Sequence, residues 1–88
     1  MTAQEKLKKY LIENSLKSTK QRNQILEIFE EHDRHMTPEE VLDVVQKGLP
    51  NVGLATIYRT MKLFVQAGIA HERRFADGLL RYELAHEG

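Results

Sequence analysis

The strongest hydrophobic pattern in the chain lies between Gly53 and Gly68. Apolar residues recur there every three or four positions, the spacing of an α-helix with one side against a core. They are Leu54, Ile57, Met61, Phe64 and Val65. The opposite side carries Ala55, Arg59, Lys62 and Gln66, with Thr56 beside it and Tyr58 at the boundary. Gly68 fits the left-handed position that ends many helices. We therefore predict an amphipathic helix whose outer side has no carboxylate.

Two shorter helical patterns open the chain. The first covers about residues 3–13 and places Leu7, Tyr10 and Leu11 on one side. The second begins after Ser18 or Thr19, since either hydroxyl suits an N-cap. It runs to about residue 31, and its candidates for burial are Ile25, Leu26, Ile28 and Phe29.

A third helix is predicted by the start signal at Thr37. Thr37 suits the N-cap, Pro38 the first helical position, and Glu40 completes a capping box. The helix is expected to end near residues 47–48 and to bury Val41, Leu42 and Val45. A short turn then leads into the helix of residues 53–68, so these two helices form a helix-turn-helix.

The period changes from helical to alternating after Gly68. Ile69, His71, Arg73 and Phe75 point to one face, and Ala70, Glu72 and Arg74 to the other. Asp77-Gly78 is a strong hairpin turn, and Leu80, Tyr82 and Leu84 alternate on the return strand. The fold class is therefore mostly α with a small β-hairpin, in the order α-α-α-α-β-β. This is a winged helix-turn-helix with an additional N-terminal helix, which we expect to form a single domain over residues 1–88.

The composition and the motifs that are missing exclude several classes of function. The chain of 88 residues has no cysteine, which excludes disulfides and thiolate metal sites. It has no signal peptide pattern and no apolar run of the roughly 18 residues that span a membrane, so a cytoplasmic protein is expected. There is no nucleophile motif, phosphate-binding glycine loop or acid–base pair, so we do not expect an enzyme.

Charge is segregated along the chain although the net charge is zero. Residues 1–26 and 47–82 are mainly basic, whereas residues 27–46 are mainly acidic. Such a chain can fold with one basic and one acidic face, and the basic face would meet a polyanion. The outer side of the 53–68 helix fits a DNA major groove for the same reason. An ordinary solvent-exposed helix surface fits that side as well.

Four segments together resemble the ferric uptake regulator family. They are Lys-Ser-Thr-Lys-Gln-Arg at 17–22, Thr-Pro-Glu-Glu-Val at 37–41, Gly-Leu-Ala-Thr-Ile-Tyr-Arg at 53–59 and Ala-Gly-Ile at 67–69. The match covers essentially the whole chain, as the N-terminal DNA-binding domain of that family. The resemblance implies a metal-sensing bacterial transcription regulator, usually a homodimer, that mostly represses from A·T-rich inverted repeats.

The resemblance also implies roles for single residues. Tyr58 and Arg59 match base-contacting positions of the recognition helix, where Ala55 also lies, and Lys17 matches a position that reaches the minor groove. This agrees with their chemistry, because arginine pairs with guanine and a tyrosine ring contacts thymine methyl groups. We assign Arg22, Thr56 and Lys62 to phosphates, and Arg73 or Arg74 to backbone contact by the wing. A core-edge tyrosine and solvated basic helix ends are the alternatives.

His35 and Glu83 match two ligand positions of the family's regulatory metal site. Imidazole and carboxylate suit Fe²⁺, Mn²⁺ or Zn²⁺. Two ligands do not complete a site, and His86 matches no ligand position, so no metal is expected to bind this chain alone. His32 and His35 also suit the end of a helix dipole without any metal, and Glu83 suits a wet strand.

The resemblance implies a fragment, because the family's dimerisation domain has no counterpart here. We expect a homodimer in the full-length protein and a monomer or weak dimer for these residues. Leu63 is apolar on the polar side of its helix, where it would pack against a neighbouring element or mark a contact surface. A winged-helix module that binds proteins instead of DNA is the alternative function, with its partner on the acidic segment or around Leu63.

Overall fold

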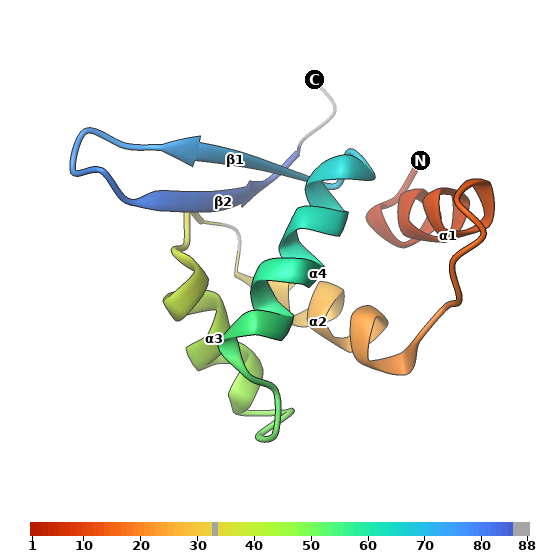
Figure 1. Cartoon of the computed structure of the whole chain (residues 1–88), viewed down its shortest axis with the longest axis horizontal. Helices are drawn as coiled ribbons and strands as arrows, with labels where there is room; N and C mark the ends of the chain where they lie inside the picture. Colours follow the sequence, from red (N-terminus) through yellow and green to blue (C-terminus); the bar gives the residue numbers. More distant parts are fainter. Residues whose placement is uncertain (33, 86–88) are drawn as a thin grey trace.

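Four helices precede a two-stranded antiparallel hairpin in the computed structural model, which describes residues 1–32 and 34–85 (Figure 1). The helices are α1 (Ala3–Glu13), α2 (Lys20–Glu31), α3 (Pro38–Gln46) and α4 (Leu54–Gln66), and the strands are β1 (Ala70–Arg74) and β2 (Leu80–Leu84). The predicted order and fold class are confirmed. Within the described residues, no helix is long and apolar enough to cross a membrane.

Local capping explains where the helices begin. Thr19, not Ser18, is the N-cap of α2, and its hydroxyl oxygen accepts a hydrogen bond of 3.1 Å from the Arg22 backbone N–H. The predicted capping box of α3 is present, with Glu40 N–H donating to the Thr37 hydroxyl and Thr37 N–H to the Glu40 carboxylate. A second capping box joins Thr2 and Glu5 at the start of α1.

The ends of α1 and α4 have the same backbone arrangement. In α4 the Ile69 N–H donates to the Phe64 carbonyl, and Gly68 has the predicted left-handed conformation with φ 77°. In α1 the Leu16 N–H donates to the Leu11 carbonyl at 2.8 Å, and the left-handed residue is Ser15, with φ 54°. Both are Schellman motifs, but the one in α1 forms without glycine.

The core gathers one side of every helix and the base of the hairpin. It contains Leu7, Leu11, Ile25, Leu26, Phe29, Met36, Val41, Val44, Val45, Val52, Ile57, Met61, Phe64, Ile69, Ala70 and Tyr82. Five predicted core residues are only half-buried, namely Tyr10, Ile28, Leu42, Leu54 and Val65, and Val44 was not predicted. Val44 is buried because α3 packs between α2 and α4, so that two sides of this short helix face protein.

The hairpin pairs Glu72 with Tyr82 and closes through Asp77 and Gly78. Gly78 has φ 81°, and the Asp77 carboxylate accepts a hydrogen bond of 2.9 Å from the Leu79 N–H. Two further hydrogen bonds join Met36 to Tyr82, at 2.9 Å and 2.7 Å, so the segment before α3 lies beside β2 as a single bridge. The wing is thereby attached to the helical part at a second point.

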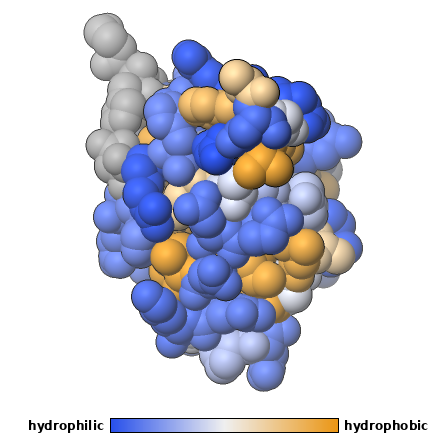
Figure 2. Space-filling model, turned by 90° about the vertical axis from the view of Figure 1, so that its left-hand side faces the viewer, coloured by the Kyte–Doolittle hydropathy of each residue, from blue (hydrophilic) through white to orange (hydrophobic). Residues whose placement is uncertain are grey.

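Figure 1 shows α4 at the centre, with α3 and the hairpin to one side and α1 to the other. Figure 2 views the molecule from the side of the hairpin tip, where apolar side chains form separate patches among polar ones. Exposed apolar residues on the hairpin are Phe75 and Leu79. The outer side of α4 lies between the N-terminal part of α2 and the wing.

Candidate nucleic-acid interface

The outer side of α4 carries the residues that the sequence singled out. Ala55, Tyr58, Arg59 and Lys62 are exposed, Tyr58 to 43% of its surface. Thr56 is half-buried, and its hydroxyl oxygen accepts a hydrogen bond of 3.2 Å from Arg59 Nη2. This bond holds the guanidinium against the helix. The first turn of α4 contains no acidic residue, so its positive dipole end is not neutralised locally.

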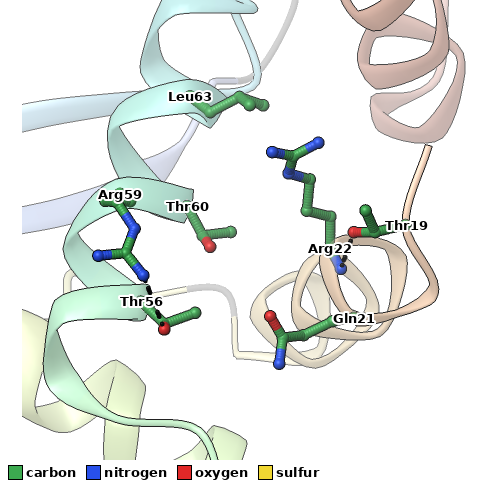
Figure 3. A pocket seen from close by; sticks show the side chains of 7 residues that line it. All are labelled: Thr19, Gln21, Arg22, Thr56, Arg59, Thr60 and Leu63. Carbon is green, nitrogen blue, oxygen red and sulfur yellow. Dashed lines mark hydrogen bonds between the residues drawn. The ribbon is translucent and has the colours of Figure 1, made fainter. Parts of the chain in front are cut away.

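A groove of about 260 Å³ lies between α4 and the beginning of α2 (Figure 3). It is lined by Thr19, Gln21, Arg22, Thr56, Arg59, Thr60 and Leu63. Arg22 Nη1 donates a hydrogen bond of 2.9 Å to the Lys17 carbonyl, which holds the segment before α2 against the arginine. Leu63 is half-buried and packs against the core, so the structure supports packing against a neighbouring element.

A second hollow, of about 360 Å³, separates α4 from the wing. Its lining includes Tyr58, Arg59 and Lys62 from α4, and Glu72 and Tyr82 from the hairpin. Glu72 therefore places a carboxylate beside the basic side of α4, which the sequence did not predict. The pKa of Tyr82 is raised, first by burial and then by the nearby charge of Glu72, so its hydroxyl stays protonated at neutral pH.

The wing's arginines are held by their own hairpin. Arg73 Nε lies 3.1 Å from Glu83 Oε1, and Arg74 Nη1 donates to the Gly78 carbonyl at 2.9 Å. Arg81 forms two hydrogen bonds with Asp77, which lower the pKa of that carboxyl group, and its guanidinium carbon lies 4.8 Å from the centre of the Phe75 ring. Both predicted wing cations thus start from an intramolecular contact.

His35 and Glu83 lie together, as the predicted metal pair requires. His35 Nε2 is 2.6 Å from Glu83 Oε2, and the imidazole meets the edge of the Phe75 ring at 5.2 Å between centroids. The two donors suit Fe²⁺, Mn²⁺ or Zn²⁺ in kind. In residues 1–32 and 34–85, however, no third histidine, cysteine or carboxylate completes a cluster. His86 is outside the described residues, and His32 places Nδ1 2.9 Å from the Ile28 carbonyl, a local helix-end contact.

The structure divides the predicted DNA-binding residues among four places. Arg22, Thr56 and Arg59 line the groove, Tyr58 and Lys62 line the hollow, and Lys17 is exposed just before α2. Arg73 and Arg74 are on the wing. The sequence pattern did not predict that Thr19, Gln21 and Thr60 line the groove or that Glu72 lines the hollow. The one available signal was Thr60, a polar residue on the predicted buried side of its helix.

Comparison with known proteins agrees with this arrangement. A sequence profile described as the ferric uptake regulator family matches residues 13–88. The ferric uptake regulation protein of Bacillus subtilis is 35% identical over 85 residues, which cover 96% of this chain and 57% of the relative. The chain belongs to the ferric uptake regulator family. The Campylobacter jejuni ferric uptake regulation protein is 38% identical over 94% of this chain and 54% of its own length.

Solved structures of this family share the fold. The ferric uptake regulator of Pseudomonas aeruginosa, determined with manganese, is 32% identical and has a TM-score of 0.80 over 100% of this chain and 63% of its own. The one from Francisella tularensis, determined with iron, is 30% identical with a TM-score of 0.72, over 83% of this chain and 56% of its own. Family members are metal-responsive transcription regulators, not enzymes. The chain spans about half the length of the curated relatives it matches.

Proposed function

We propose that this chain is the DNA-reading part of a metal-responsive transcription repressor, and that it binds duplex DNA at A·T-rich inverted repeats. The observation that carries the proposal is the outer side of α4, where Arg59 and Lys62 are exposed beside a groove lined by Arg22 and by no carboxylate. Cations and hydroxyl groups on an exposed helix match phosphates and base edges in the major groove. Flanking elements at the start of α2 and on the wing would then contact the two DNA strands.

Each residue has a specific role in this proposal. Arg59 pairs with a guanine edge and the Tyr58 ring contacts thymine methyl groups, while Ala55 lets the helix approach the bases. Lys17 enters a narrow minor groove, whose potential attracts a cation. Arg22, Thr56, Lys62, Arg73 and Arg74 contact the sugar–phosphate backbone. For Arg73 this requires exchange of its bond to Glu83 for one to a phosphate.

The deciding experiment compares Arg59→Ala with Arg73→Ala on duplexes that this chain selects from a random pool. Loss of a base contact should cost about 1–3 kcal/mol on the preferred duplex and flatten the preference among sequences. Loss of a backbone contact should weaken all duplexes alike and keep their ranking. Fluorescence anisotropy with both variants measures affinity and ranking together. An unchanged ranking in Arg59→Ala would leave α4 without a reading role and favour the protein-binding alternative.

The metal response is proposed to act through His35 and Glu83. They are two ligands of a regulatory site for Fe²⁺, or for Mn²⁺ or Zn²⁺, and further ligands must come from outside the described residues. When bound, such an ion links the wing to whatever supplies the remaining ligands. In the full-length dimer that link would set the separation of two recognition helices on successive half-sites. A cytoplasmic location in a bacterium follows from this role.

Calorimetric titration with Zn²⁺ tests the pair directly. Two ligands do not complete a site, so only weak binding is expected, and only at high Zn²⁺ concentration; His35→Ala should abolish it, while Arg34→Ala, a neighbouring exposed position, should not. The DNA affinity of the metal-free chain should remain the same in His35→Ala. Equal Zn²⁺ binding by His35→Ala and the unchanged chain would remove the metal proposal and leave the DNA proposal intact.

A further inference from the structure

The groove between α2 and α4 is lined by side chains of one chemical character. Three hydroxyl groups, one carboxamide and two guanidinium groups surround it, together with Leu63. No carboxylate belongs to the lining. Figure 3 shows Arg22 and Gln21 of α2 on one side, with Thr60 and Arg59 of α4 on the other. A space so lined favours an anion that accepts several hydrogen bonds.

Thr60 is the informative residue of this groove. It is only 6% exposed, and Figure 3 shows its hydroxyl directed into the space between the two arginines. Within residues 1–32 and 34–85 the hydroxyl has no hydrogen-bond partner, and its oxygen remains accessible from the groove. A hydroxyl that opens into the groove can donate a hydrogen bond to a ligand there, which a valine of the same shape cannot do. Thr60 therefore offers the groove a free hydroxyl beside two guanidinium groups, which is a combination that suits an anionic ligand.

The charges around Thr60 point to the same kind of ligand. The backbone of α2 begins beside the groove, its N-cap Thr19 contributes to the lining, and its first turn has no acidic residue. The positive end of the helix dipole therefore adds to the charge of Arg22. The arginine is also prepositioned, since Nη1 is bonded to the Lys17 carbonyl and leaves its other donors available. A negatively charged group in the groove would lower the energy of all these partners.

We propose that this groove seats one backbone phosphate of the bound DNA, held by the Thr60 hydroxyl, the Gln21 carboxamide and the Arg22 guanidinium. The inference rests on the proposed function and adds a contact that would fix the position of the protein along the DNA duplex. The groove opens beside the outer side of α4, so a DNA strand at the edge of the major groove would pass close to it, and phosphate contacts of this kind fix the register of a protein on the duplex. Thr60 and Gln21 thereby become positioning residues that fix how deeply α4 enters the groove, while Arg59 reads the base.

The test uses Thr60→Val, which keeps the shape of the side chain, and Thr60→Ser, which keeps the hydroxyl. The probe is the best duplex that the chain selects from a random pool, synthesised as a series with one neutral methylphosphonate at each backbone position. Thr60→Val should weaken binding to the unmodified duplex about tenfold, because it removes a hydrogen bond to a charged group. Thr60→Ser should bind as tightly as the unchanged chain.

A methylphosphonate at one backbone position should lower the affinity of the unchanged chain. The same modification should not lower the affinity of Thr60→Val any further, because the phosphate and Thr60 are the two partners of one contact. The salt dependence of DNA affinity distinguishes the contribution of the neutral Thr60 from that of the charged Arg22. Arg22→Ala should reduce the slope of log affinity against log salt by about 1, whereas Thr60→Val should leave the slope unchanged. Thermal melting of each variant shows that the fold is retained.

Three results would overturn parts of the scheme in different ways. No binding of any duplex by the unchanged chain removes the proposed function itself. Normal DNA binding by Thr60→Val, or additive losses at every methylphosphonate position, removes the phosphate seat alone. Inorganic phosphate that competes with DNA more than chloride of equal ionic strength, and only when Thr60 is present, would show a site for free phosphate and not for the DNA backbone.

Discussion

Ser15 holds a backbone conformation that serine rarely adopts. Its φ of 54° is the only positive value outside glycine in residues 1–32 and 34–85, and the Leu16 N–H bonds to the Leu11 carbonyl beside it. The left-handed region costs a residue with a Cβ roughly 1 kcal/mol more than glycine. Ser15→Gly should therefore raise the free energy of unfolding by about 0.5–1 kcal/mol, measured by urea denaturation.

The matched control is Ser18→Gly in the same connection. Ser18 is exposed and its φ is not positive, so glycine there only adds freedom to the unfolded chain. This variant should be slightly less stable than the unchanged chain. Stabilisation by both substitutions, or by neither, would show that the backbone at Ser15 is not under strain.

The Glu40 carboxyl group makes the stability of the α3 capping box depend on pH. Its pKa is lowered, first because its carboxylate accepts a hydrogen bond from the Thr37 backbone N–H. A carboxyl group whose pKa is lower in the folded state stabilises the fold above the unfolded pKa of about 4.3, and this contribution is lost as pH falls through the folded pKa. Glu40→Gln should therefore lose less stability than the unchanged chain between about pH 6 and pH 3.

Urea midpoints at several pH values measure this difference. Glu5 and Asp77, whose pKa values are also lowered by hydrogen bonds, provide an acid-sensitive background common to both proteins. Only the difference between the two curves belongs to the α3 capping box. Parallel curves over the whole range would mean that the Glu40 bond contributes nothing to folding.

The wing places a negative charge beside the basic side of α4. Glu72 of β1 lines the hollow with Arg59 and Lys62, where a DNA backbone close to α4 would meet a carboxylate. Glu72→Gln should raise affinity for all duplexes about two- to fivefold at low salt, since it removes one repulsion of a surface-charge magnitude. The rise should shrink as salt increases, and anisotropy titrations at two ionic strengths measure both effects.

Glu39→Gln supplies the comparison for that experiment. Glu39 is an exposed carboxylate in the first turn of α3, and it is absent from the lining of both the groove and the hollow. It changes the net charge by the same amount as Glu72→Gln. Equal gains from the two substitutions would indicate a general charge effect instead of one from the wing.

Elements were predictable where their signals are local. Thr37, Pro38 and Glu40 define the start of α3 within four residues, and the structure has them in those roles. The sequence could not show whether Ser18 or Thr19 is the N-cap of α2, because both hydroxyls suit that position. The path of the preceding chain determines which of them takes it. Val44 was missed for a similar reason, since its burial requires protein on two sides of α3.

Over the whole molecule, DNA binding should depend strongly on salt despite a net charge of zero. Neutralisation of about four phosphates gives a slope near −3.6 in log affinity against log salt. A fourfold rise in salt should therefore weaken binding on the order of 100-fold, measured by anisotropy with a fixed duplex. An affinity that stays constant over this range would contradict a phosphate-dominated interface.

The candidate site was predictable only in part. A helical pattern predicts that Arg59 and Lys62 face outward, but it does not show which element lies beside them. Thr60, Gln21 and Glu72 acquire their roles from α2 and the wing, which are distant in sequence. The pairing of His35 with Glu83 followed from family resemblance, because residues 48 positions apart share no local signal.

The bridge between Met36 and Tyr82 determines how motion would travel through this domain. Two backbone hydrogen bonds fasten the segment before α3 to β2, one residue from both His35 and Glu83. A displacement of His35 and Glu83 cannot move the hairpin alone without breaking these two hydrogen bonds. Such a displacement would therefore also move α3, and α4 through its packing against α3. The domain would consequently rotate as one rigid body, so that a displacement at the wing would move the outer side of α4 in the major groove.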